Sequence, residues 1–316
     1  MSIVLLSLRA IIPVFGIIAI GYFIRCIKLM KENDAKNLNL LCFNVFLPAL
    51  CFNSTYNNSG EMGEYTRLII FITVTFCVLT ILVFLIIPKF EPNRCRKGVD
   101  VQGIYRSNAL LMGLPIVVNL YGEAGALPAV LTIGIILPLQ NLFAVEAMTR
   151  FVSDDTSGAG HIWKTLTGIC KNPLLIAIIL GMVLSGCDIV LPSLLLDIIA
   201  DFSEVATTLA LTSLGATFTF TNVTNNIGHI FWISVGKLIV YPSISIVLAI
   251  MLGFTGVEIA TIIAVFATPC GVSGYTMAAA TDNDGELAGQ LVVITSVAAI
   301  FTMTAIFSIC QVGGWI

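Results

Sequence analysis

Two segments place proline and glycine inside long apolar stretches, one segment in each half of the chain. The first reads Asn-Ala-Leu-Leu-Met-Gly-Leu-Pro over 108–115, and the second reads Ala-Thr-Pro-Cys-Gly-Val-Ser-Gly over 267–274. Prolines such as Pro115 and Pro269 remove a backbone hydrogen bond and clash with the preceding turn. In a bilayer, broken helices persist only where protein or a wet cavity surrounds them. Together the two segments predict a site where exposed peptide groups bind a polar ligand, although either segment alone could be a simple kink.

Polar side chains near these breaks indicate which kind of ligand the site could bind. The Asn108 amide can donate to a carboxylate without burying a full charge; an ordinary interhelical hydrogen bond is the alternative. Lys237 lies deep in an apolar stretch, where a charge costs about 3 kcal/mol or more. It could neutralise the negative ends of broken helices or act as counter-ion to the substrate. Gln140 could face the breaks or bond within a helix bundle.

Three further residues are weaker candidates for the substrate site. Asn44 and Cys51 are two helical turns apart and are predicted to share a face, although a cysteine there often serves only packing. Asn172 precedes Pro173 at a predicted helix start. It could cap that helix, or the helix N-terminus could meet an anion.

The composition requires a membrane to surround these segments. Hydrophobic residues make up 58% of the 316 positions and charged residues only 10%, whereas a soluble domain has roughly 25% charged residues. A helix spanning the bilayer core needs about 20 apolar residues. The sequence predicts an all-α membrane protein with ten spans, over residues 3–24, 37–56, 67–88, 102–121, 125–149, 165–187, 191–220, 229–252, 258–280 and 287–312.

The basic residues predict how these spans are oriented. Most of them fall in or beside three connections: Arg25, Lys28, Lys31 and Lys36; then Lys89, Arg94, Arg96, Lys97 and Arg106; then Arg150, Lys164 and Lys171. Short basic connections stay in the cytoplasm. All three then face the cytoplasm, and both termini are predicted to face outward from the cell membrane.

The breaks occupy matching places, because each lies in the fourth span of a five-span half. We therefore predict a first repeat over 1–150, a cytoplasmic connector over 151–163 and a second repeat over 164–316. An odd number of spans per unit inserts the second unit from the opposite face. Such inverted repeats are a common plan of secondary transporters, with the substrate site near the midplane.

Several short runs, in order along nearly the whole chain, are similar to those of one known family. The sequence resembles the auxin efflux carrier family, which includes plant PIN-FORMED carriers and bacterial malate-permease-like proteins. The resemblance rests on the run from Phe43 to Phe52, Ser107-Asn108, Gly113-Leu114-Pro115, Tyr121-Gly122-Glu123, Gln140, Lys171-Asn172-Pro173, and Lys237 before Pro242.

The resemblance implies two inverted repeats whose fourth and ninth helices cross at their breaks, and a transport bundle that moves against a scaffold like an elevator. It implies carboxylate transport, with Asn108 and Cys51 near the substrate, and related folds suggest a homodimer. The chain lacks the long cytoplasmic loop of the plant carriers. The acid that some members carry in the third helix is absent from 67–88, so the coupling ion, a proton or sodium, stays open.

We predict a secondary active transporter of malate-like or other small carboxylates. A cation/proton exchanger of related architecture is the alternative, although such proteins usually place paired acids in the membrane. A passive channel would show conductance instead of saturable flux. An enzyme would need a nucleophile with a base or clustered metal ligands, and neither is evident. We predict no cofactor, no metal and no nucleic-acid partner.

Overall fold

The computed structural model describes residues 3–57, 63–152, 173–217, 226–279 and 281–316. In these ranges the chain is helical, and its one β-type feature is an isolated bridge. The first half holds α1 Ile3–Cys26, α2 Glu32–Leu41, α3 Leu47–Asn57, α4 Thr66–Ile86, α5 Arg94–Tyr105, α6 Leu114–Tyr121 and α7 Glu123–Arg150. The second holds α9 Pro173–Gly186, α10 Ser193–Thr217, α11 Ile227–Val235, α12 Tyr241–Met251, α13 Val257–Phe266, α14 Val272–Ala279 and α15 Gly285–Val312.

Long apolar helices support a multi-pass membrane protein. Five helices in the described ranges are long and apolar enough to cross a bilayer, and four shorter ones are apolar over 10–17 residues. The helix α4 exposes a stripe of large apolar side chains that includes Ile70, Val74 and Val78. Such a stripe suits lipid and not water. The exposed pair of Glu146 and Arg150, 3.4 Å apart, ends α7.

Three short π-helical turns explain how prolines fit inside the helices. The turns η1 Cys42–Phe46, η4 Ala109–Gly113 and η6 Gly236–Val240 are each followed, two residues later, by Pro48, Pro115 or Pro242. A π turn is wider than an α turn, which relieves the clash of the proline ring with the preceding turn. The helices therefore continue through these prolines.

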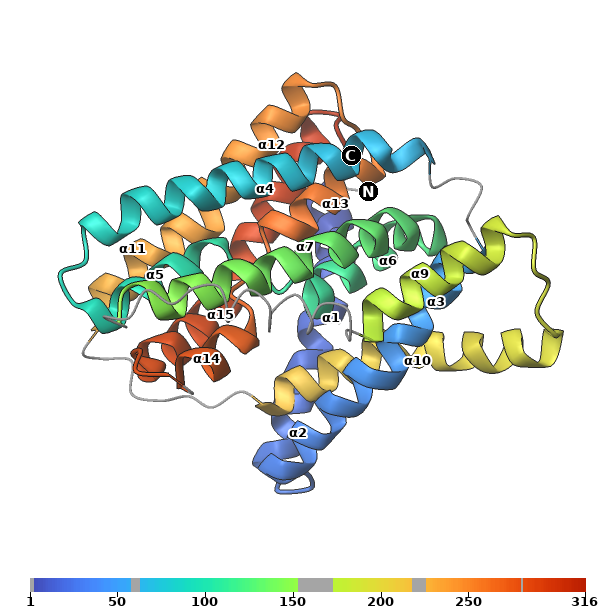
Figure 1. The fold of residues 1–316 in the computed structure, drawn as a ribbon, viewed down its shortest axis with the longest axis horizontal. Helices are drawn as coiled ribbons and strands as arrows, with labels where there is room; N and C mark the ends of the chain where they lie inside the picture. Colours follow the sequence, from blue (N-terminus) through green and yellow to red (C-terminus); the bar gives the residue numbers. More distant parts are fainter. Residues whose placement is uncertain (1–2, 58–62, 153–172, 218–225, 280) are drawn as a thin grey trace.

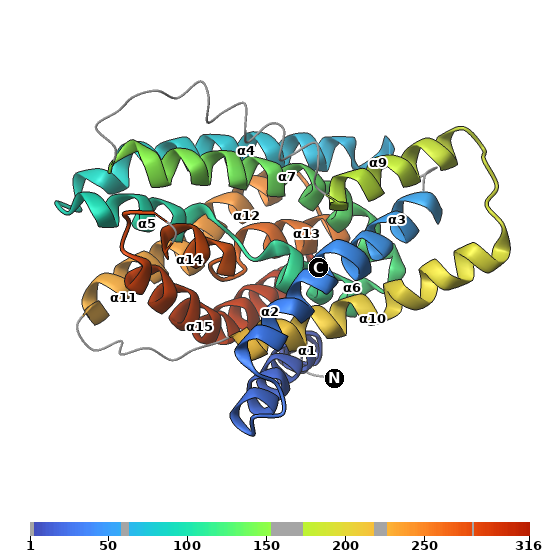
Figure 2. The ribbon, with the colours of Figure 1, turned by 60° about the horizontal axis from the view of Figure 1, so that its bottom comes forward.

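The helices form two groups that mix both halves of the sequence. In one, α1 packs on α10, α3 packs on α9, and α3 also contacts α10. In the other, α7 contacts α4, α5 and α6, while α15 contacts α11 and α14. Figures 1 and 2 show α3, α9 and α10 on one side of the molecule and α5, α11 and α14 on the other. Contacts of α1 with α15 and of α3 with α7 join the groups.

Two glycines allow α1 and α10 to approach closely. A Cβ at Gly215 would lie 1.9 Å from the carbonyl oxygen of Ile18, and one at Gly21 would lie 2.2 Å from that of Thr212. Small residues at such contacts are typical of helix pairs in membranes. The guanidinium of Arg25 adds a hydrogen bond of 2.8 Å to the carbonyl oxygen of Ala216.

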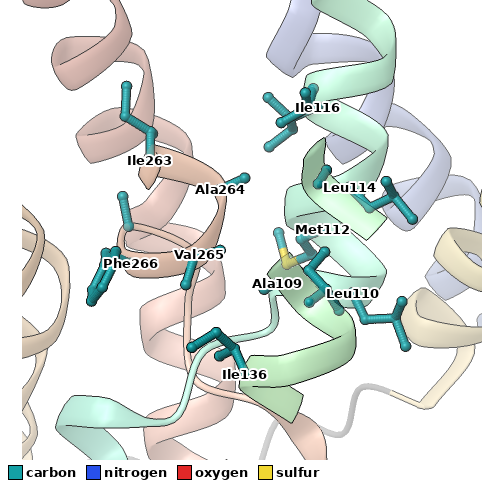
Figure 3. Packing of buried hydrophobic residues seen from close by; sticks show 14 of the residues in the cluster. Ala109, Leu110, Met112, Leu114, Ile116, Ile136, Ile263, Ala264, Val265 and Phe266 are labelled. Atoms are coloured by element: carbon teal, nitrogen blue, oxygen red, sulfur yellow. The ribbon is translucent and has the colours of Figure 1, made fainter. Parts of the chain in front are cut away.

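The fourth predicted span differs from its prediction. We expected one helix over 102–121 interrupted near Pro115, but α5 begins at Arg94 and ends at Tyr105, and the chain is extended at Arg106. Pro115 instead lies directly after η4 in a helix that runs from Ala109 to Tyr121, and the π turn makes room for its ring. Figure 3 shows Ala264 of α13 pointing toward the segment formed by η4 and α6, whereas Phe266 points to the other side of α13.

Candidate functional site

The two helix breaks meet through their backbones. Ser107 forms an antiparallel bridge with Cys270. The Asn108 N–H donates to the carbonyl oxygen of Pro269 over 2.9 Å, and the Gly271 N–H donates to that of Arg106 over 3.4 Å. We call residues 106–108 and 267–271 together the crossing. Peptide groups freed in an apolar interior must be satisfied, and here each break supplies partners for the other.

The two breaks have different causes. Pro269 cannot donate to the carbonyl four residues earlier and biases the preceding residue away from helix, so α13 ends at Phe266. The first break contains no proline or glycine, and Ser107 and Asn108 are residues that compete for backbone hydrogen bonds. Gly113 brings η4 close to α13, since a Cβ there would lie 2.5 Å from the carbonyl oxygen of Ala264.

Arg106 is a buried cation at the crossing, with only 3% of its surface exposed. Its Nη2 donates to Asn141 Oδ1 over 2.7 Å and to Ser273 Oγ over 2.8 Å. Its Nε also donates to Ser273 Oγ, over 3.1 Å, and its Nη1 lies 3.5 Å from Met277 Sδ. All of these partners are neutral, so they satisfy N–H groups without neutralising the positive charge.

Lys237 brings a second buried cation to the same place. Its side chain is fully buried, and Nζ donates to Ser107 Oγ, next to Arg106. Nζ also lies 5.4 Å from the centre of the Tyr241 ring. In the part of the chain that the structure describes, no carboxylate pairs with Lys237 or Arg106. The C-terminal ends of α5 and α13 offer only partial negative charge.

Two buried amide donors at or beside the crossing have nothing to donate to. Within the described ranges, Nδ2 of Asn108 and Nε2 of Gln140 are buried and lack a hydrogen-bond partner. Gln140 lies on α7 beside Asn141, and its backbone carbonyl oxygen accepts from the hydroxyl of Tyr105 over 3.5 Å. A buried polar group without a partner costs about 1–3 kcal/mol. Such donors call for an acceptor.

A small pocket reaches the crossing between α5, α14 and α15. Gln102, Arg106, Cys270, Gly271 and Tyr275 contribute to its lining. Its free volume is about 20 Å³, which holds about one water molecule, so the pocket must widen before a carboxylate can reach the Arg106 guanidinium. A larger pocket of about 150 Å³, lined in part by Asn53, Asn57 and Glu204, lies between α3, α10, α6 and α7.

The structure brings together some of the predicted site residues and not others. Asn108 and Pro269 meet directly, and Lys237 and Gln140 lie beside them. Two more predicted residues lie elsewhere: Pro115 is buried in α6, and Cys51 lies in an apolar pocket with Leu110. Asn172 lies outside the described residues.

Asn44 corrects one prediction. It is exposed and donates to the carbonyl oxygen of Leu40 in its own helix over 2.7 Å, whereas Cys51 is 2% exposed. The two residues do not share an environment, because the π turn η1 changes the helical phase between them. Asn44 therefore serves below as a control position.

Arg106 differs from its prediction. Its place just beyond the third basic connection predicts a position near the cytoplasm, yet it is buried at the crossing. The available signal was its position: it directly precedes the Ser107-Asn108 pair and follows the apolar end of α5. Its acceptor Asn141 and its neighbour Gln140 were adjacent in sequence, but their role depended on α7 packing against α5.

The fold and the crossing define a class of protein: a multi-pass membrane transporter with a polar centre where two broken helices meet. The profile of the family described as membrane transport protein matches residues 6–150 and 161–307. The chain therefore belongs to this family, that of the auxin efflux carriers, which confirms the resemblance seen in its motifs.

Two archaeal relatives match along almost their whole length, and both are described as uncharacterized transporters. The one from Methanothermobacter thermautotrophicus is 21% identical over 305 residues, which cover 94% of this chain and 96% of the relative. The one from Methanocaldococcus jannaschii is 22% identical over 303 residues, with coverages of 92% and 95%. The family and both relatives are transporters, which agrees with the prediction that the chain is not an enzyme.

Proposed function

We propose that this protein is a secondary transporter of small carboxylate anions, which bind at the crossing. One observation carries the proposal: the crossing gathers buried donors and cations without an anionic acceptor. Arg106 and Lys237 have no carboxylate partner among the described residues, and two buried amide donors there lack an acceptor: Asn108 Nδ2 at the crossing and Gln140 Nε2 on α7. A carboxylate supplies both the negative charge and the acceptor oxygens.

The cations have a second role that needs no substrate. The C-termini of α5 and α13 end at the crossing, and positive charge there is favourable. This role accounts for a buried cation, but it does not account for unpaired amide donors. The amides therefore favour the substrate role, and their substitution separates the two.

The proposed transport cycle moves one helix group against the other. The scaffold consists of α1, α2, α3, α9 and α10, and the moving part contains the crossing. The pairing of α1 with α10 and of α3 with α9 supports an inverted repeat, because equivalent helices of two such units exchange partners. We propose ten spans, termini outside the cell membrane, and a homodimer held by the scaffold.

Asn108→Ala is expected to reduce carboxylate flux at least about tenfold, because the substrate loses a hydrogen bond from a buried donor; bonds to charged groups are worth about 1.5–3 kcal/mol. Purified protein in proteoliposomes is assayed for saturable uptake of malate and a panel of related carboxylates. Asn44→Ala is the matched control, since Asn44 is exposed and bonds within its own helix. Unchanged flux in Asn108→Ala would place the substrate elsewhere.

The proposed topology predicts which native cysteines face the outside. Cys26 and Cys187 are both free and exposed, but they end α1 and α9 on opposite sides of the membrane in a ten-span arrangement. A membrane-impermeant maleimide applied to intact cells is expected to label Cys187 and not Cys26, as read by peptide mass spectrometry. Permeabilised cells should label both. Labelling of Cys26 alone in intact cells would show that the protein has the opposite orientation in the membrane.

A further inference from the structure

A histidine lies between two carboxylates at the other end of the helices that form the crossing. The Nε2 of His229 is 2.8 Å from Oδ1 of Asp100, and its Nδ1 is 3.4 Å from Oε2 of Glu91. Asp100 is 1% exposed and Glu91 is 8% exposed. We call these residues the histidine cluster. Its members come from the connection after α4, from α5 and from the first turn of α11.

The two contacts of the His229 ring fit its protonated form. An imidazole can donate from both nitrogens only when both carry a proton, as in imidazolium. His229 can make both contacts in that state and loses one donor when the proton leaves. Oδ2 of Asp100 is also buried and has no hydrogen-bond partner in the described ranges, so the cluster keeps an unused acceptor. The side chain of His229 is 27% exposed, which gives a proton a path from water.

A single metal ion fits the same three side chains less well. One oxygen or nitrogen atom from each can lie within 4.8 Å of the others. A metal ion would bind only one ring nitrogen, however, and here the two nitrogens contact two different carboxylates. The geometry therefore favours a shared proton, and metal binding becomes an outcome of the test.

The charges around the cluster are themselves compensated. Arg96 of α5 pairs with Asp284 before α15 over 3.0 Å and also donates to Asn226. The next acid on α15, Glu286, accepts from Gln290 over 3.2 Å. Arg96 is therefore held by its own carboxylate, whereas His229 directly contacts both acids of the cluster.

The cluster is connected to both cations of the crossing. His229 and Lys237 lie on one continuous helical span, Ile227–Met251, about 12 Å apart along its axis. Asp100 lies on α5, which ends next to Arg106, and α11 packs against α5 (Figures 1 and 2). The contact between His229 and Asp100 therefore connects α11, whose span contains Lys237, with α5, which ends next to Arg106.

We propose that Glu91, Asp100 and His229 form a proton-binding site whose occupancy is linked to anion binding at the crossing. Gain or loss of the proton changes the contact that holds α11 to α5, and these helices carry Lys237 and lead to Arg106. The linkage rests on the proposed function, whereas the proton site stands by itself. A proton moving with the anion would also balance part of its charge.

The proton site is tested by nitrogen NMR of histidine-labelled protein in nanodiscs. The chain has only two histidines, and His161→Gln leaves His229 as the single signal. We expect both ring nitrogens to titrate together between about pH 5 and 9. In Asp100→Asn and Glu91→Gln the midpoint should move by about one pH unit or more to lower pH, because a carboxylate partner of the imidazolium is lost. Glu146→Gln, which alters an exposed acid on α7, should leave it unchanged.

Three outcomes would overturn the proton site. The first is a ring that keeps one neutral form throughout, and the second is a midpoint that neither Asp100→Asn nor Glu91→Gln moves. In the third, micromolar Zn²⁺ abolishes the titration in the unaltered cluster, which would make it a metal site. No transport is needed for these measurements. If His229 titrates as expected but no carboxylate of the panel is transported, the proposed function fails and the proton site stands.

The linkage is tested in proteoliposomes with radiolabelled malate, or with the member of the panel that gives the highest flux, and an entrapped pH dye. We expect uptake to change internal pH and to respond at least fivefold to a pH change from 6 to 8. His229→Gln should remove this response, and Glu146→Gln should keep it. Uptake with the same pH response in His229→Gln would overturn the linkage.

Discussion

Replacing Arg106 by glutamine is expected to weaken carboxylate binding at the crossing by about tenfold to a hundredfold. A hydrogen bond to a charged group is worth about 1.5–3 kcal/mol, and glutamine removes the charge as well as the forked donor geometry. Glutamine is long enough to retain part of the contact with Asn141 and Ser273. Binding is measured by calorimetry on the purified protein, with the carboxylate that gives the highest flux.

Two further variants separate a substrate contact from a structural role. Arg106→Lys keeps the charge but not the fork, so it should recover part of the affinity. Arg150→Gln is the control, because Arg150 is an exposed partner of Glu146. The thermal midpoint of substrate-free Arg106→Gln should change little, because removal of a buried charge offsets the lost interaction with the C-terminal ends of α5 and α13. Full affinity in Arg106→Gln would exclude a contact between Arg106 and the anion.

Gly113→Val is expected to abolish transport without altering any polar or charged group of the crossing. A Cβ at this position would lie 2.5 Å from the backbone oxygen of Ala264, so α13 must move away from η4. Overpacking of this kind costs about 1–3 kcal/mol or more. The same movement pulls the carbonyl oxygen of Pro269 away from the N–H of Asn108, which donates to it over 2.9 Å. Flux in proteoliposomes and the thermal midpoint are both expected to fall.

The matched control is Gly16→Val in α1, because a Cβ there meets nothing within 4 Å. This variant makes the same chemical change in another apolar helix, and it should transport at nearly the parental rate. If Gly113→Val and Gly16→Val behave alike, the close contact between η4 and α13 is not needed for transport.

The helices were largely predictable, because a membrane imposes a strong local rule. Stretches of about 20 apolar residues have few alternatives in a bilayer, and α1, α7 and α15 begin and end close to their predicted limits. The second break was also predictable, since Pro269 removes a backbone donor inside an apolar stretch and Gly271 follows it two residues later. The described residues leave the ten-span count and the outward termini as predictions.

The first break was predicted at the wrong place, and the reason is physical. Pro115 was predicted to break the helix, but the π turn η4 before it accommodates its ring, and the helix continues. The chain breaks at Arg106 to Asn108, where no residue forces it to do so. There the backbone bonds to Pro269 and Gly271 replace those of a helix, and partners 161 and 165 residues away leave no local signal.

The sequence by itself determined that this protein spans a membrane, that it resembles a carrier family and that Pro269 and Gly271 interrupt one of its apolar stretches. These properties depend on composition and on neighbours along the chain. Only the tertiary structure decided that Arg106 is buried, that Lys237 bonds to Ser107, and that His229 lies between Glu91 and Asp100. The electrostatic meaning of a charge depends on the groups that surround it in space, and packing brings those groups from distant parts of the chain.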